Sequence, residues 1–187
     1  MATKEKTEAQ YEKAVAEILD LFSKKAEDYG TAWRILRTSS VTDQIYIKAR
    51  RIRAVQQAGE NKVGEGLRPE FIGIANYSAM ALVQITKGAV SSPDMEADEA
   101  IEIVRDQFSK AQKLMIKKNH DYREAWRSLR ISSIADLILQ KLLRIKQIED
   151  GQKENLAPEE MHTLHLDMIN CAIFALILID EGRDEMK

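Results

Sequence analysis

A block of 29 residues occurs twice in this chain and decides its fold class. The first copy, residues 24–52, reads KKAEDYGTAWRILRTSSVTDQIYIKARRI, and the second, residues 117–145, reads KKNHDYREAWRSLRISSIADLILQKLLRI. The copies are offset by a constant 93 residues, and 16 of their 29 positions are identical. Self-similarity at a fixed period is the signature of a repeated supersecondary unit. We therefore expect a tandem duplication, with one repeat in residues 1–90 and the other in residues 91–187.

Apolar residues before each block recur with the spacing of one helix face. The face is formed by Tyr11, Val15, Ile18 and Phe22, and 93 residues later by Val104, Phe108, Ala111 and Met115. This spacing predicts amphipathic helices at about residues 7–27 and 93–118. Ser92 and Pro93 suit the N-cap and first helical position of the second of these helices. A short helix is expected after each, at residues 31–37 and 123–130.

A third helix is expected in each repeat, beginning at a serine. Ser40 and Ser133 are followed three residues later by Asp43 and Asp136, which is the spacing of a capping box. A carboxylate in the first turn would also be stabilised by the positive end of the helix dipole. Capping is therefore the predicted role of both aspartates. The loops that follow are expected at residues 59–68 and 150–157.

The fourth helix of each repeat is apolar on most sides. It is expected to start near Pro69 and Pro158 and to end at Gly88 and Gly182, which are placed as C-terminal caps. A helix that is hydrophobic all round belongs in the centre of a fold. No strand pattern occurs in the sequence. The predicted fold is all-α, with two repeated four-helix units packed about a pseudo-twofold axis and sharing one core.

Composition and charge exclude several classes of protein. A net charge of −2 argues against a protein that coats nucleic acid in general, which would be strongly basic. The single Cys171 cannot form a disulfide framework and suits a reducing compartment. The N-terminus lacks the apolar core of a signal peptide, and the 12-residue apolar run Met168–Ile179 is too short to span a bilayer. We expect a soluble cytoplasmic protein with no membrane partner.

Lys48 and Lys141 are the most informative candidates for a functional site. Each lies in the middle of an otherwise apolar helix stripe, at equivalent positions of the two repeats. A buried ammonium without a partner costs several kcal/mol, so each lysine should meet an anion or reach solvent through a pocket. The alternative is that the aliphatic stem lies along the edge of the core while the charged end reaches water.

Four arginines accompany these lysines. Arg51 and Arg144 lie one turn beyond them, and Arg37 and Arg130 end the preceding short helix. One cationic cluster per half would suit phosphate or carboxylate through bidentate guanidinium contacts. The alternative is that the arginines pair with local acids such as Asp121 and tie helices together.

Polar residues on the fourth helix complete the candidate set. Asn76 and Asn170 lie within apolar sequence, where a buried amide must be hydrogen-bonded. Asp167 lies three residues before Asn170 and corresponds to Gly73 in the first repeat. It is expected either to pair with Lys141 or to bind a metal. Trp126 is expected in the core, with stacking on a base as the alternative.

The repeated motif resembles a known family. Lys-x-x-Asp-Tyr-x-x-Ala-Trp-Arg-x-x-Arg-x-Ser-Ser-x-x-Asp-x-x-x-x-Lys, followed on a later helix by Asp-x-x-Asn, resembles the nucleotide-modification-associated domain family. The resemblance covers nearly the whole chain as two copies. It implies a link to modified nucleotides and no particular activity.

The four-helix unit also resembles the all-α NTP pyrophosphatases of the MazG and dimeric dUTPase type. That resemblance implies Mg²⁺ held by paired carboxylates on adjacent helices. Here the third helix carries Lys48 and Lys141 where that class has clustered glutamates, and the fourth helix keeps Asp167 with Glu160 nearby. Asp167 is therefore the candidate metal ligand.

Two functions from different classes follow. The first is a nucleotide-binding or nucleotide-processing protein with a small-molecule nucleotide as ligand and Mg²⁺ as the cofactor of any hydrolysis. Phosphates would be held by Arg130, Lys141 and Arg144, with Asp121, Asp167 and Asn170 reading the ligand or coordinating Mg²⁺. If the protein is an enzyme, Asp121, Lys141 and Asp167 are its predicted catalytic residues. The equivalent cluster in the first repeat would be degenerate because Gly73 replaces the acid. The second is a non-enzymatic helical module, with homo-oligomerisation left open.

Overall fold

The computed structural model describes residues 2–60, 66–151 and 158–187, and every regular element within them is helical. The elements in chain order are α1 (Ala2–Tyr29), the 3₁₀ helix η1 (Ala32–Ile35), α2 (Thr38–Ala58), α3 (Arg68–Lys87), α4 (Ala97–Tyr122), the 3₁₀ helix η2 (Ala125–Ser128), α5 (Ile131–Glu149) and α6 (Pro158–Asp180). The second half repeats the element order of the first. Because all the elements in the described residues are helices, the all-α prediction is confirmed. The two predicted loops lie largely outside the described residues.

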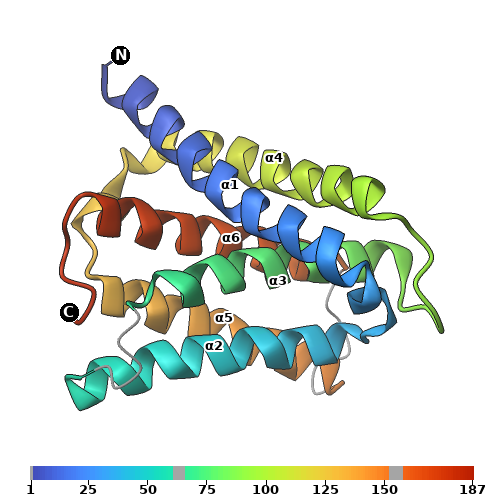
Figure 1. Cartoon of the computed structure of the whole chain (residues 1–187). Helices are drawn as coiled ribbons and strands as arrows, with labels where there is room; N and C mark the ends of the chain where they lie inside the picture. The colour runs from blue at the N-terminus through green and yellow to red at the C-terminus, as the bar shows by residue number, and fades with distance from the viewer. Residues whose placement is uncertain (1, 61–65, 152–157) are drawn as a thin grey trace.

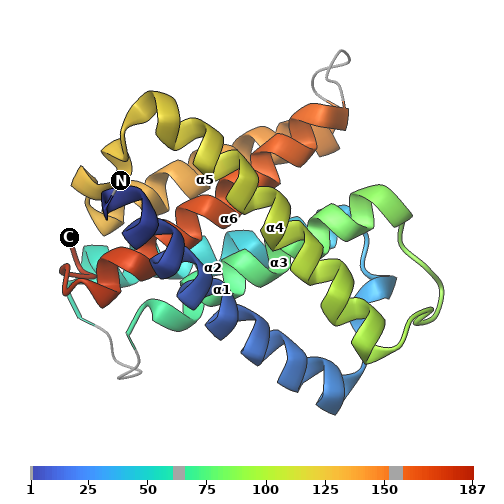
Figure 2. The same cartoon turned by 90° about the horizontal axis from the view of Figure 1, so that it is seen from above.

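The six α-helices form three layers, and each layer pairs one helix with its own repeat copy. Helices α3 and α6 form the middle layer, between α1 and α4 on one side and α2 and α5 on the other (Figure 1). Seen from above, α1 and α4 run in opposite directions (Figure 2). Buried apolar residues from all six helices form one continuous core. The halves therefore share a core, as the sequence predicted.

Two ion pairs between α2 and α5 show the relation between the halves. Asp43 Oδ1 lies 2.7 Å from Lys146 Nζ, and Asp136 Oδ1 lies 3.8 Å from Arg53 Nε. The repeat counterparts of Asp43 and Arg53, 93 residues later, are Asp136 and Lys146. The two ion pairs are therefore equivalent. The predicted capping role of both aspartates is wrong, because α2 begins at Thr38 and α5 at Ile131, without side-chain caps. Each aspartate instead bridges the two repeats.

The arginine that follows each tryptophan fixes a chain segment to the bundle. Arg34 is only 1% exposed, and its Nε donates to Asp94 at 3.0 Å. The hydroxyl of Thr31 donates to the carbonyl of Met95 at 2.7 Å. These contacts hold the segment before α4 against η1 in a non-helical conformation. The predicted helix start at Pro93 is therefore wrong, and α4 begins at Ala97.

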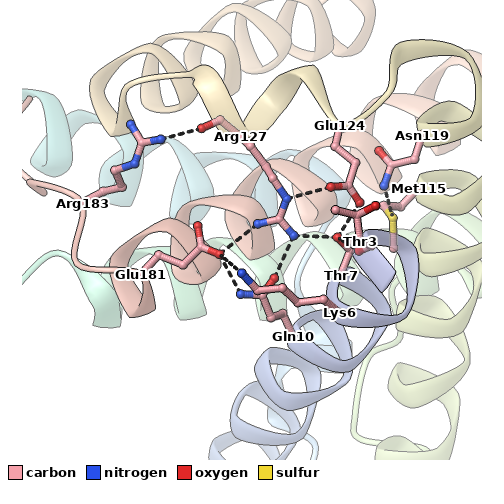
Figure 3. A network of polar contacts seen from close by, with 10 residues as sticks. All are labelled: Thr3, Lys6, Thr7, Gln10, Met115, Asn119, Glu124, Arg127, Glu181 and Arg183. Carbon is pink, nitrogen blue, oxygen red and sulfur yellow. Dashed lines mark hydrogen bonds and ion pairs between the residues drawn. The ribbon is translucent and has the colours of Figure 1, made fainter. Parts of the chain in front are cut away.

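Arg127, the counterpart of Arg34, joins three elements. Its guanidinium donates to Glu124 at 2.8 Å, to Gln10 at 2.8 Å and to Glu181 at 3.0 Å (Figure 3). These partners lie beside η2, on α1 and just after α6. A half-buried guanidinium with several anchored acceptors fixes the relative positions of all three.

The middle helix α6 ends in the glycine cap that the sequence predicts. Gly182 has φ +81°, and its N–H donates to the carbonyl of Ile179 while that of Arg183 donates to Leu178, which is a Schellman motif. By length and composition alone, Glu159–Asp180 is apolar enough to cross a membrane, so the prediction from the 12-residue run does not hold for the whole helix. Of the apolar stretch of this helix, 56% is buried inside the fold. The buried core helix of a soluble protein can have the same length and apolar composition.

His165 is an unsatisfied polar group in this core. It is 0% exposed, and neither ring nitrogen has a hydrogen-bond partner among the described residues. Burial lowers the pKa of His165 to about 3, with a smaller contribution from His162. The equivalent position in the first repeat holds Phe71, which is equally buried. The fold therefore accepts an apolar ring here.

We predict that His165→Phe stabilises the protein and removes part of its acid sensitivity. An unsatisfied buried donor costs about 1–3 kcal/mol. Between pH 6.5 and pH 3 the unfolded His165 binds a proton that the folded one does not, so wild-type stability falls as pH drops below 6.5. The variant's advantage should grow by about 2 kcal/mol from pH 7 to pH 5, given about 1.4 kcal/mol per pKa unit. Urea denaturation at both pH values measures it, and a pH-independent difference would contradict the account.

Candidate functional site

A cavity of about 290 Å³ in the second half brings together four of the predicted residues. They are Trp126, Lys141, Asp167 and Asn170. The wall comes from the end of α4, from η2, from α5 and from α6. The remaining lining is mainly apolar and aromatic, with Met115, Tyr122, Ala125, Leu129, Leu137 and Phe174. The cavity combines a charged rim with an apolar interior.

Asp167 is the electrostatic centre of this cavity. Its Oδ1 lies 2.6 Å from Lys118 Nζ and its Oδ2 lies 3.6 Å from Lys141 Nζ. The carboxylate is 16% exposed and the Lys141 side chain 25% exposed, which confirms that Lys141 meets an anion inside the fold. The three side chains come from α6, α4 and α5. Two ammonium groups and one carboxylate leave a formal charge of +1.

The first half contains an equivalent cavity of about 350 Å³. It is built by α1, η1, α2 and α3, the repeat copies of the helices above. The residues that correspond to Lys118, Trp126, Lys141, Asp167 and Asn170 are Lys25, Trp33, Lys48, Gly73 and Asn76, and all five line it. The duplication has therefore produced two cavities, and not only two sets of helices.

Gly73 is the position at which the two cavities differ most. A Cβ added there would lie 2.5 Å from Lys48 Cε, so the stem of the lysine occupies the space that Asp167 fills in the second half. Lys48 Nζ lies 3.9 Å from Glu70, one turn earlier on α3, and Arg51 pairs with the same carboxylate. The first half therefore also supplies an acid, but displaced by one turn.

The two buried asparagines make equivalent bonds through their amide N–H groups. Asn170 Nδ2 donates to the carbonyl of Ala111 at 3.0 Å, and Asn76 Nδ2 donates to that of Ile18 at 3.3 Å. Asn170 Oδ1 also accepts from the hydroxyl of Tyr11 at 2.7 Å, whose pKa is raised by burial. Asn76 Oδ1 is buried without a partner among the described residues. Both amides therefore tie helices together, but only Asn170 is satisfied.

Trp126 contributes an edge to the cavity and not a free ring face. Phe174 stacks on it with centroids 4.1 Å apart and planes 4° from parallel. The Arg127 guanidinium carbon lies over the ring, 4.4 Å from its centroid. Phe174 and Arg127 therefore occupy the ring of Trp126, and the structure gives no support to stacking of a base on it. Its Nε1 is buried without a partner among the described residues.

A family model, nucleotide modification associated domain 1, matches residues 25–85 and 118–179. The chain belongs to this family. The two matched segments start at Lys25 and Lys118, and they contain nearly all of the lining of the two cavities. No curated protein matches the chain, and no solved structure matches it. The resemblance to all-α NTP pyrophosphatases therefore stays a prediction.

Several predicted residues of this family member lie outside the cavities. Arg144 Nε donates to Glu160 at 2.8 Å, and Arg37 and Arg130 are exposed at the N-caps of α2 and α5. The predicted cationic clusters therefore form only in part, through Lys48 and Arg51. Arg51 and Arg144 pair with Glu70 and Glu160 on the neighbouring helix, whereas Arg37 and Arg130 lie at the surface.

Asp121, predicted beside Asp167, belongs to a different place. It lines a separate cavity of about 760 Å³ between the start of α1 and the end of α4. Its carboxylate is exposed and lies 3.1 Å from His120 Nδ1. Asp121 and Asp167 thus line different cavities, and a joint role for them stays a prediction.

The residues present do not fit a metal centre. The described part of the chain has no group of three or more His, Cys, Asp or Glu side chains placed to share an ion. Both oxygens of Asp167 face lysines, and Glu160 is paired with Arg144. Burial raises the pKa of the Cys171 thiol to about 11, so it is protonated at neutral pH. The cavity is equipped for binding anions more than for metal or thiol chemistry.

Sequence analysis missed Lys118 and Lys25 as site residues. Both lie inside the repeated block, one residue after its start, and both are identical between copies. They lie near the C-terminal end of long helices, where lysines usually face solvent. Repetition alone does not distinguish them, because the neighbouring exposed Lys24 and Lys117 are also identical between the copies.

We predict that Gly73 and Lys48 are energetically coupled. Replacing glycine by alanine inside a helix adds about 1 kcal/mol of stability when space allows. In the wild-type protein the new Cβ would collide with Lys48, so Gly73→Ala should give no gain. In a Lys48→Ala background the gain should appear. Chemical denaturation of the wild type, both single variants and the double variant forms the cycle. Additive effects would show that Lys48 does not occupy this space.

Proposed function

We propose that the second-half cavity binds a nucleotide, and that the protein acts in the metabolism of modified nucleotides. The observation that carries the proposal is the convergence of Lys118 and Lys141 on Asp167 at the rim of an aromatic cavity. Family membership supports the same ligand class. Small-molecule sites typically combine an apolar interior with a few polar groups that fix orientation.

The lysines can hold a phosphate without losing Asp167. An ammonium group has three N–H donors. Lys118 uses one toward Asp167, and Lys141 forms an ion pair with the same carboxylate at 3.6 Å. The remaining donors and the formal charge of +1 favour an anion at the rim. Asp167 holds both ammonium groups in place and offers acceptor capacity to ligand hydroxyl or amino groups. Its role in the proposal is therefore to position the lysines.

The cavity favours a single nucleotide. Its volume of about 290 Å³ is at the lower end of the range for ligand sites, roughly 300–1,000 Å³. A base would lie against Leu129, Leu137 and Tyr122, since the faces of Trp126 are covered. Hydrolysis is the narrower form of the proposal. It receives no support from the carboxylates present, so the proposal is one of binding.

A second function is favoured by the pairing of the repeated charges with one another. Asp167 engages Lys118 and Lys141, and Glu70 engages Lys48. Polar pairs of this kind can fix the packing register of helices without any ligand. The alternative is therefore a non-enzymatic helical module, and the same experiment separates the two.

We predict that nucleotides raise the Tm of the protein and that Lys118→Met and Lys141→Met each weaken binding at least tenfold. Methionine keeps an unbranched apolar side chain while removing the charge. Thermal shift and calorimetry with nucleoside mono- and triphosphates, each with and without Mg²⁺, measure the effect. Lys110→Met is the control, because Lys110 is an exposed α4 lysine paired with Asp106 outside the cavity.

The outcomes separate the two functions. Binding that is lost with either cavity lysine and kept in the control supports the nucleotide site. If no nucleotide shifts the Tm of the wild type, the site is rejected and the helical module remains. Release of inorganic phosphate or pyrophosphate in the same samples would extend the proposal to hydrolysis.

A further inference from the structure

We propose that the first-half cavity is a second ligand site, which takes an anionic heteroaromatic molecule of the nucleoside monophosphate class. The sequence predicted that this half is degenerate, because glycine stands at the position of Asp167. The structure instead contains a cavity in this half as well, lined by Lys25, Lys48 and Asn76. The inference uses residues of α1, η1, α2 and α3 alone, so it and the second-half site can each fail separately.

Two buried polar atoms among the residues that line this cavity have no partner among the described residues. They are Oδ1 of Asn76, an acceptor, and Nε1 of Trp33, a donor. Asn76 is only 7% exposed. A buried polar group left unpaired costs about 1–3 kcal/mol, which a ligand would recover by bonding to it. Both atoms belong to side chains of the cavity wall.

The open acceptor has an identifiable cause. In the second half, Tyr11 donates to Asn170 Oδ1 at 2.7 Å. The residue 93 positions after Tyr11 is Val104, which has no donor. Asn76 is kept and its Nδ2 bonds to Ile18 as Asn170 does to Ala111, yet its Oδ1 is left open. The first-half cavity therefore has an unfilled bonding site that the second-half cavity lacks.

The missing acid changes how the lysines of this cavity are paired. Lys25 lines the cavity and has no ion pair within the described part of the chain, whereas its counterpart Lys118 is bound to Asp167. Lys48 shares Glu70 with Arg51. The charged residues that line the first-half cavity, Lys25, Lys48 and Glu70, sum to a formal charge of +1, the same as Lys118, Lys141 and Asp167 in the second half. Glycine at position 73 therefore leaves the formal charge unchanged, but Lys25 lacks the carboxylate that binds Lys118.

The walls suit a planar heterocycle. Phe22, Tyr29, Trp33 and Tyr77 line the cavity. Phe22 meets Trp33 edge-on at 6.4 Å, so Phe22 does not cover a Trp33 face in the way that Phe174 covers Trp126. The Arg34 guanidinium lies over the Trp33 ring at 5.9 Å, farther than Arg127 from Trp126. A heterocyclic base edge carries both donors and acceptors, and so could supply a partner to either of the two unpaired atoms. The volume of about 350 Å³ admits one such ligand with a single phosphate.

The chain offers a direct test, because each cavity contains one of its two tryptophans. In ¹⁵N-labelled protein the two indole N–H resonances report separately on the two sites, and Trp33→Phe and Trp126→Phe serve only to assign them. We expect the Trp33 resonance to move downfield and saturate on titration with AMP, GMP, CMP or UMP. Lys25→Met and Lys48→Met should weaken that response at least tenfold, while Lys118→Met and Lys141→Met should leave it within twofold.

Each result either supports or overturns the inference. A saturable Trp33 shift that depends on Lys25 and Lys48 supports it, whether or not Trp126 responds. A Trp33 resonance that stays fixed with all four nucleotides overturns it, and a Trp126 response alone would then sustain only the second-half site. A Trp33 shift abolished by Lys141→Met would also overturn it, since the signal would be transmitted from the other cavity.

Discussion

Burial of α3 and α6 is the constraint on which the rest of this structure depends. Both helices are apolar on most sides, and residues such as Ala75 and Leu176 have no exposed surface. A helix of this kind must be covered on every side. One repeat supplies only part of that cover, so each central helix also packs against its own copy and beneath the outer helices of both halves (Figure 1). Duplication provides the missing cover, because helices of each repeat also pack against the central helix of the other repeat.

The same constraint explains why the candidate sites lie where three helices of one half meet. The central helix is apolar, so a polar residue on it is tolerated only at its edge, where side chains from neighbouring helices can satisfy it. Asp167 satisfies this condition through lysines on α4 and α5. His165, two residues earlier, does not, and it remains neutral with a pKa lowered to about 3. The position on the helix face therefore decides whether a polar side chain is paired, as in Asp167, or buried without a partner among the described residues, as in His165.

Sequence reasoning succeeded where the repeat or the periodicity carried the information. It predicted the helices, the shared core and the meeting of Lys141 with Asp167, because apolar spacing and burial costs act locally along the chain. It failed where two partners are distant in sequence. Asp43 was expected to cap its own helix but bridges to Lys146, and the helix expected from Pro93 is delayed because Asp94 binds Arg34. Such pairings depend on the packing of helices that no local pattern describes.

The fate of position 73 shows how a duplicated fold can diversify without losing stability. Twofold packing holds the backbone of both halves alike, so large changes in shape are resisted by the common core. Charge is under no such restraint, because a carboxylate at the cavity wall can be removed if a nearby lysine fills its space. Lys48 does this against Gly73, and Glu70 supplies a displaced counter-charge. The fold thereby keeps two cavities of similar construction and equal formal charge, in which the position of the acid and the pairing of the lysines differ.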